Sequence, residues 1–178
     1  MLILKDGSYV TNLPKVLVAI PAYNEEECIE GTILELKRVA PEFDFVVIND
    51  GSRDCTLELC TNLGCNVINM LINCGLTVGF QTAACYALEN DYDYMVQFDA
   101  DGQHRPEYIS ELVSKAQFDN ADIVIGSRFL SMRKDMSMRM FGSRMITFLI
   151  KMLTGKRISD PTSGFRLFNR DILKEYSC

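Results

Sequence analysis

The sequence predicts an α/β fold in which a mostly parallel sheet is covered by helices on both faces. Short, continuous apolar runs alternate along the chain with segments of helical periodicity. A strand with one face in solvent alternates apolar and polar residues. These runs do not alternate in this way, which favours strands that are buried on both faces. The 178 residues, 48% of them hydrophobic, can bury a sizeable core, so we expect one domain over residues 1–178.

Each element follows from local signals. Strands are expected at 16–20, 43–48, 66–71, 94–98 and 123–125. Helices are expected at about 24–40, after residue 54, at 78–89 and at 106–118. Asn24 and Glu27 have the spacing of a helix cap with a reaching glutamate, and Asp54 can cap the second helix. Pro106 suits a first helical turn.

Polar residues follow four of the predicted strands. The stretches are PAYNE at 21–25, NDGS at 49–52, DAD at 99–101 and GSR at 126–128. Ligands of parallel α/β sheets bind beyond the carboxyl ends of the strands. The order of motifs therefore predicts a site along this edge.

Asp99 and Asp101 end a buried strand, where two neighbouring carboxylates repel unless a positive charge lies close by. A divalent cation with oxygen ligands supplies that charge, and Gln103 offers a further amide oxygen. A calcium loop of the EF-hand type is excluded, because it needs Gly and Glu where this chain has His104 and Ser110. An acid–base pair and a solvated turn remain alternatives. We do not favour His104, the only histidine, as a base.

The net charge of −6 conceals a basic segment at 128–157, which has eight basic residues and a single acidic one, Asp135. Within it, a helix is expected at about 136–153, with a polar row through Arg139 and Lys151 opposite an apolar face. This helix either packs on the core and exposes its basic face to solvent, or lies on an anionic membrane surface. The charge pattern favours an anionic partner for the segment.

The seven cysteines are odd in number and form no C-x-x-C pair, so we expect buried thiols rather than a zinc site. Reduced thiols fit the cytosol. The N-terminus carries no signal peptide, and no run reaches the length of a membrane span.

The four strand-end motifs, in this order, resemble family 2 glycosyltransferases of the GT-A fold. The similarity is greatest to the dolichol-phosphate-mannose synthase-like branch and covers roughly residues 15–170. The stretch DPTSGFR at 160–166 and the pair Arg139 and Ser143 strengthen it.

This resemblance implies roles for individual residues. Nucleotide-sugar binding falls to Pro21, Ala22, Tyr23, Glu25, Asp50, Asp99, Ala100 and Asp101. Asp99, Asp101 and Gln103 would hold Mg²⁺ or Mn²⁺. Asp99, Asp101 and Arg128 are the catalytic candidates, and Arg128, Arg139, Ser163 and Arg166 would lie near the acceptor.

The implied reaction is an inverting transfer of a sugar from a UDP- or GDP-linked donor. A sugar hydroxyl needs a base, whereas a phosphate monoester is already ionised near neutral pH and needs cations. The basic segment supplies cations, so we expect a polyprenyl-phosphate acceptor. Alternatives are a saccharide acceptor in cell-surface polysaccharide synthesis and a non-catalytic nucleotide-binding module. A nucleotidyltransferase is disfavoured, because residues 21–25 lack a basic glycine-rich loop.

The expected place is the cytoplasm, peripheral to the cytoplasmic face of the membrane, with no nucleic-acid partner. Relatives in this branch often continue into transmembrane helices. The chain is therefore either truncated at its C-terminus or used with a membrane anchor protein.

Overall fold

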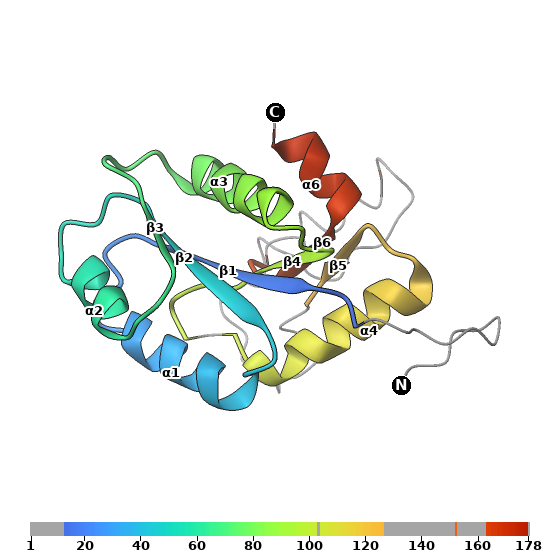
Figure 1. Ribbon diagram of the computed structural model, residues 1–178, viewed down its shortest axis with the longest axis horizontal. Helices are drawn as coiled ribbons and strands as arrows, with labels where there is room; N and C mark the ends of the chain where they lie inside the picture. The colour runs from blue at the N-terminus through green and yellow to red at the C-terminus, as the bar shows by residue number, and fades with distance from the viewer. Residues whose placement is uncertain (1–12, 103, 127–151, 153–162, 178) are drawn as a thin grey trace.

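A computed structural model describes residues 13–102, 104–126, 152 and 163–177, and shows one sheet between two helical layers (Figure 1). The strands are β1 (Val16–Ala22), β2 (Asp44–Asn49), β3 (Val67–Asn69), β4 (Tyr94–Gln97), β5 (Ile123–Ile125) and β6 (Arg166–Asn169). The helices are α1 (Ile29–Val39), α2 (Thr56–Asn62), α3 (Leu76–Glu89), α4 (Ile109–Asp119) and α6 (Arg170–Tyr176), with a 3₁₀ turn at Pro106–Tyr108.

The strand order in the sheet is β3-β2-β1-β4-β6-β5. The pairs among β1, β2, β3 and β4 are parallel, whereas β6 runs antiparallel to both β4 and β5. Opposite β4, Gln97 is paired with Arg166, so β6 begins where β4 ends. The start of β6 therefore lies at the same edge as the carboxyl ends of the parallel strands.

The two faces of the sheet are buried by different helices. Val18 and Ile20 of β1 join one apolar cluster with α1 and α4, and Leu17 and Ala19 join another with α3 and α6. Figure 1 shows α1, α2 and α4 below the sheet and α3 and α6 above it. Successive strand residues point to opposite faces, which is why β1 reads as one continuous apolar run.

The predicted mostly parallel sheet is confirmed, and the five predicted strands agree with β1–β5 to within two residues at their ends. The predicted cap at Asn24 is wrong. Helix α1 begins at Ile29, and Asn24 has a positive φ of 54°. The Asn24 side chain instead accepts the backbone N–H of Arg53 at 2.9 Å, so it joins two loops rather than capping a helix.

Asp54 does act at the start of α2, where its Oδ1 accepts the backbone N–H of Thr56 at 3.0 Å. Strand β6 and the antiparallel pairing were not expected. The helix predicted at 136–153 and the basic segment at 128–157 lie outside the described residues, apart from Met152. In the part of the chain that the structure describes, no helix is both long and apolar enough to cross a membrane.

Candidate active site

A cavity of about 340 Å³ opens at the carboxyl edge of the sheet. Residues from the ends of β1, β2 and β4 and from the start of α3 line it. They are Pro21, Ala22, Tyr23, Glu25, Ile48, Asp50, Asn73, Gly75, Leu76, Gly79, Asp99, Ala100 and Asp101. All eight residues predicted to bind the nucleotide sugar are among them.

The wall after β1 is built from Pro21 to Glu25. Tyr23 is 44% exposed, so its ring is accessible from the cavity. The backbone N–H of Glu25 donates to Thr56 Oγ1 at 2.9 Å, and its carbonyl accepts the N–H of Ile29 at the start of α1. These bonds fix the turn that carries Tyr23 and Glu25 past the end of the strand.

The wall after β2 depends on Asp50, which is buried. Its Oδ1 accepts the backbone N–H of Cys74 at 2.7 Å, and its Oδ2 accepts that of Gly75 at 2.8 Å. Hydrogen bonds to a charged acceptor are shorter and stronger than neutral ones. Asp50 therefore holds the loop before α3 in place, and this loop brings Asn73 and Gly75 to the cavity.

The same loop packs closely on the glycine that follows Asp50. A β-carbon on Gly51 would lie 2.7 Å from the backbone nitrogen of Asn73, and Gly51 has a φ of +67°. Both the close approach and the positive φ require glycine. The motif NDGS thus fixes the position of a second loop that is more than 20 residues away in the sequence.

Asp99 and Asp101 follow β4 and face the cavity from its other side. Between them Ala100 is buried, and its carbonyl accepts a hydrogen bond from Thr32 Oγ1 of α1 at 2.8 Å. The turn continues through Gly102, whose φ of +71° lies in the left-handed region. The backbone between the two carboxylates is therefore anchored while both side chains remain partly or fully accessible.

The cavity is strongly negative. Burial raises the pKa of Glu25 above its ordinary value, and the nearby carboxylates of Asp101, Asp54 and Asp99 raise it further. A carboxyl group whose ionisation is opposed by three others marks a place where a bound cation would be favourable. Carboxylate oxygens are ligands that Mg²⁺ and Mn²⁺ prefer.

The described residues contain no cluster of three or more His, Cys, Asp or Glu side chains that could enclose a metal ion. Asp99 and Asp101 would thus supply two carboxylate ligands to an ion at the open cavity. The predicted third ligand, Gln103, lies outside the described residues.

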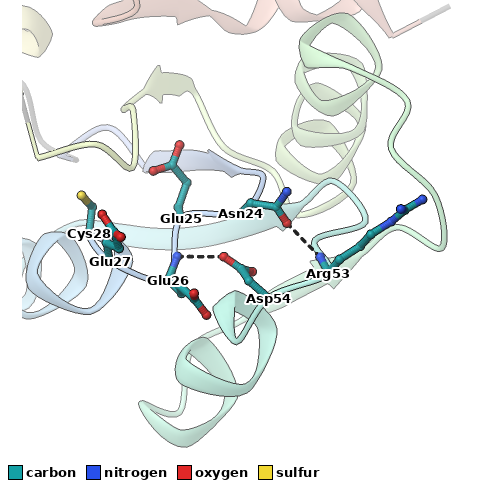
Figure 2. A pocket seen from close by; sticks show the side chains of 7 residues that line it. All are labelled: Asn24, Glu25, Glu26, Glu27, Cys28, Arg53 and Asp54. Atoms are coloured by element: carbon teal, nitrogen blue, oxygen red, sulfur yellow. Dashed lines mark hydrogen bonds between the residues drawn. The ribbon is translucent and has the colours of Figure 1, made fainter.

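A second cavity of about 420 Å³ lies beside the first, and Glu25 lines both. Figure 2 shows Asn24 to Cys28 on one side of it and Arg53 and Asp54 on the other. The backbone N–H of Glu26 donates to Asp54 Oδ2 at 3.1 Å across this gap. These contacts join the loops after β1 and β2, and so support the wall of the first cavity.

The predicted acceptor residues are only partly described. Ser163 is fully buried, and its Oγ accepts the backbone N–H of Phe165 at 3.2 Å. Arg166 begins β6, and its Nε donates to the carbonyl of Ser163 at 2.7 Å. Both contacts shape the turn before β6, and an acceptor role for either residue stays a prediction. Arg128 and Arg139 lie outside the described residues.

Sequence reasoning did not single out Asn73 and Leu76 as cavity residues, nor the contact of His104 with Asp99. His104 Nε2 lies 2.9 Å from Asp99 Oδ2. The sequence offered one signal for Asn73, which is its place before the glycine that opens α3. His104 lies only five residues after Asp99, but its ring stacks on Phe165 of a distant segment, and this packing leaves no local signal.

Comparisons with known proteins identify the family of the chain. The sequence profile of glycosyl transferase family 2 matches residues 17–177. Polyprenol monophosphomannose synthase of Mycolicibacterium smegmatis is 29% identical, over 96% of this chain and 68% of its own length. Undecaprenyl-phosphate mannosyltransferase of Micrococcus luteus is 30% identical, over 90% of this chain and 68% of its own.

A solved structure shares the fold. Glucosyl-3-phosphoglycerate synthase from Mycobacterium tuberculosis, in complex with Mn²⁺, UDP and phosphoglyceric acid, matches with a TM-score of 0.72 at 19% identity. The match covers 89% of this chain but only 57% of the solved chain, so this chain spans less than two thirds of that protein. The predicted GT-A fold is confirmed at this level. By the extent of the profile match, the chain belongs to glycosyl transferase family 2.

Proposed function

We propose that this protein transfers a sugar from a UDP- or GDP-linked donor to a polyprenyl phosphate. The observation that carries the proposal is that all eight predicted nucleotide-sugar residues line one cavity. The named relatives from M. smegmatis and M. luteus are polyprenyl-phosphate mannose enzymes, which supports the acceptor class.

The donor fits the cavity by its chemistry. Tyr23 offers an exposed aromatic ring for a base or ribose, and the loop held by Asp50 offers the polar side chain of Asn73. Asp99 and Asp101 lie on the other side, where the diphosphate of the donor would be repelled without a cation. A divalent ion held by these two carboxylates would neutralise the negative charge of the departing diphosphate. The solved synthase carries Mn²⁺ and UDP, which supports this donor class.

The charge of the acceptor decides which groups the protein has to supply. A phosphate monoester carries its nucleophilic oxygen in ionised form near pH 7, so it needs neighbouring cations rather than a base. Arg128 and Arg139 of the basic segment 128–157 are the proposed cations, and Ser163 and Arg166 would also lie near the acceptor. Attack from the face opposite the leaving group makes the transfer inverting. The protein would act from the cytoplasmic face of the membrane, with a membrane anchor protein as a further proposed partner.

The test is a transfer assay with the full chain. Labelled UDP- and GDP-sugars are incubated with vesicles that contain undecaprenyl phosphate or dolichyl phosphate, and in parallel with free saccharides. We expect labelled lipid, with transfer lost on chelation of divalent ions. Labelled saccharide and no labelled lipid would instead establish the saccharide acceptor, and donor binding without any transfer would favour a binding module.

A paired variant isolates the acceptor site. We expect Arg128→Ala combined with Arg139→Ala to abolish lipid transfer and to leave UDP or GDP binding unchanged. Lys115→Ala is the matched control, because Lys115 is an exposed cation on α4 that is paired with Asp119. If the double variant retains transfer, the acceptor assignment is wrong.

A further inference from the structure

His104 is held by aromatic rings on two sides. Its side chain is only 4% exposed. The imidazole stacks on Phe165, with ring centroids 5.2 Å apart and planes at 23°, and it meets the edge of Phe98 at 5.6 Å. Phe98 and Phe165 also contact each other at 5.8 Å. The three rings form a cluster that fixes the plane of the imidazole.

This orientation directs Nε2 at Asp99. The distance from His104 Nε2 to Asp99 Oδ2 is 2.9 Å. An ionised carboxylate only accepts hydrogen bonds, so Nε2 has to be the protonated nitrogen in this contact. The bond holds one oxygen of a side chain that is itself 34% exposed and lines the donor cavity. A buried group thus sets the rotation of an accessible carboxylate.

The backbone of Gly164 also lies against Asp99. A β-carbon at position 164 would overlap the Asp99 carboxylate and lie 2.7 Å from its Oδ1. The segment cannot withdraw easily, because the carbonyl of Phe165 accepts the N–H of Gly126 at 2.8 Å and Arg166 is paired with Gln97. Asp99 therefore lies between a fixed imidazole and a fixed peptide.

We infer that His104 is a positioning residue for the Asp99 carboxylate, and that it presents this carboxylate to the divalent ion of the donor complex. The inference rests on the proposed function, since it assumes that Asp99 binds the ion. Hydrogen bonds to a metal-binding carboxylate fix its orientation, and losing such a partner typically lowers metal affinity about 10–100-fold. His104 itself does not touch the ion or the sugar.

The test separates the hydrogen bond from the packing. His104→Phe keeps an aromatic ring against Phe98 and Phe165 but has no N–H, whereas His104→Gln keeps an N–H near the position of Nε2. Mn²⁺ affinity is measured on the full chain from the electron paramagnetic resonance signal of free Mn²⁺, in the presence of UDP and, separately, of GDP. Thermal unfolding of each variant without metal reports on folding.

We expect His104→Phe to weaken Mn²⁺ binding about 10–100-fold and His104→Gln to stay within about threefold of wild type. Tyr92→Phe is the matched control, because it removes another hydrogen bond from a buried aromatic residue to a carboxylate, that of Asp44, at the opposite end of β2 from the cavity. It should leave Mn²⁺ affinity unchanged.

The inference would be overturned if His104→Phe bound Mn²⁺ as tightly as wild type does, or if His104→Gln lost Mn²⁺ affinity tenfold. If His104→Phe does not fold, the His104→Gln result decides. A wild-type protein that binds no Mn²⁺ with either nucleotide would overturn the proposed function itself, which distinguishes the two failures.

Discussion

The backbone of Gly164 lies directly against the carboxylate of Asp99, two residues whose segments are 65 positions apart in the chain. A β-carbon on Gly164 would lie 2.7 Å from both Cγ and Oδ1 of Asp99. Real β-carbons are not found this close to other heavy atoms, so an alanine would require either the carboxylate or the turn before β6 to move.

Gly164→Ala should therefore destabilise the protein and disturb the donor cavity together. We expect a loss of about 1–3 kcal/mol in the free energy of unfolding, typical of overpacking, and weaker Mn²⁺-dependent nucleotide binding. Urea unfolding and calorimetric titration measure the two effects. Gly31→Ala is the control, because a β-carbon there meets nothing within 4 Å in a helix. Gly31→Ala should stabilise the protein by about 0.5–1 kcal/mol. If both variants changed the free energy of unfolding equally, the close contact between Gly164 and Asp99 would be contradicted.

Asp50→Ala should release the loop before α3. The variant leaves the backbone N–H groups of Cys74 and Gly75 without their acceptor, which costs about 1–3 kcal/mol. Because the loop carries Asn73, we also expect nucleotide affinity to fall. Asp119→Asn, which alters an exposed pair with Lys115, should change stability by less than about 0.5 kcal/mol. Nucleotide affinity that is unaffected by Asp50→Ala would show that the loop does not form the donor wall.

Glu25 should make the metal-free protein less stable as the pH rises. Its pKa in the folded state is raised above the ordinary value of 4.5, by burial first and then by Asp101, Asp54 and Asp99. Its stabilising contribution is complete below pH 4.5, where the unfolded chain is also protonated, and is lost as the pH rises through the folded-state pKa.

We therefore expect Glu25→Gln to be more stable than wild type at pH 7 and equal to it below pH 4.5. Urea unfolding without divalent ions, at several pH values, measures the difference. A constant difference across the pH range would mean that the carboxylates around Glu25 do not act on it.

Cys60 should resist alkylation while exposed thiols react. Burial raises the pKa of Cys60 to about 11, so at pH 8 only about one thiol in a thousand is ionised. Cys74 is exposed, and it lies in the chain between Asn73 and Gly75, which line the cavity. Mass spectrometry after brief treatment with iodoacetamide should find Cys74 modified and Cys60 intact, and treatment in urea should modify both. Rapid modification of Cys60 in the folded protein would contradict its place in the core.

The sequence was informative where structure depends on local pattern. Continuous apolar runs located β1 to β5, and the rule that ligands bind beyond strand ends brought Tyr23, Asp50 and Asp99 to one cavity. Asn24 shows the limit of local pattern. Its spacing from Glu27 suits a helix cap, but its side chain is bound to the backbone of Arg53, 29 residues later.

The segments around β6 could not be placed from local signals. Strand β6 has only two apolar residues, Leu167 and Phe168, and its direction is set by how the chain returns to the sheet between β4 and β5. That return also brings Gly164 and Phe165 against Asp99 and His104. The grouping of the strand-end residues around one cavity was therefore predictable, while the packing of Gly164 and Phe165 against Asp99 and His104 depended on the tertiary structure.

The central claim is that Asp99 and Asp101 hold a divalent ion together with a nucleoside diphosphate. It is tested most directly by thermal unfolding of wild type and Asp101→Asn with UDP or GDP, with and without Mn²⁺. Binding at 100 times the dissociation constant stabilises a folded protein by about 2.7 kcal/mol. We expect the stability of wild type to rise by about this amount with at least one nucleotide, and only when Mn²⁺ is present. We expect no rise in stability for Asp101→Asn. A rise of the same size in the variant, or none in wild type with either nucleotide, would contradict the claim.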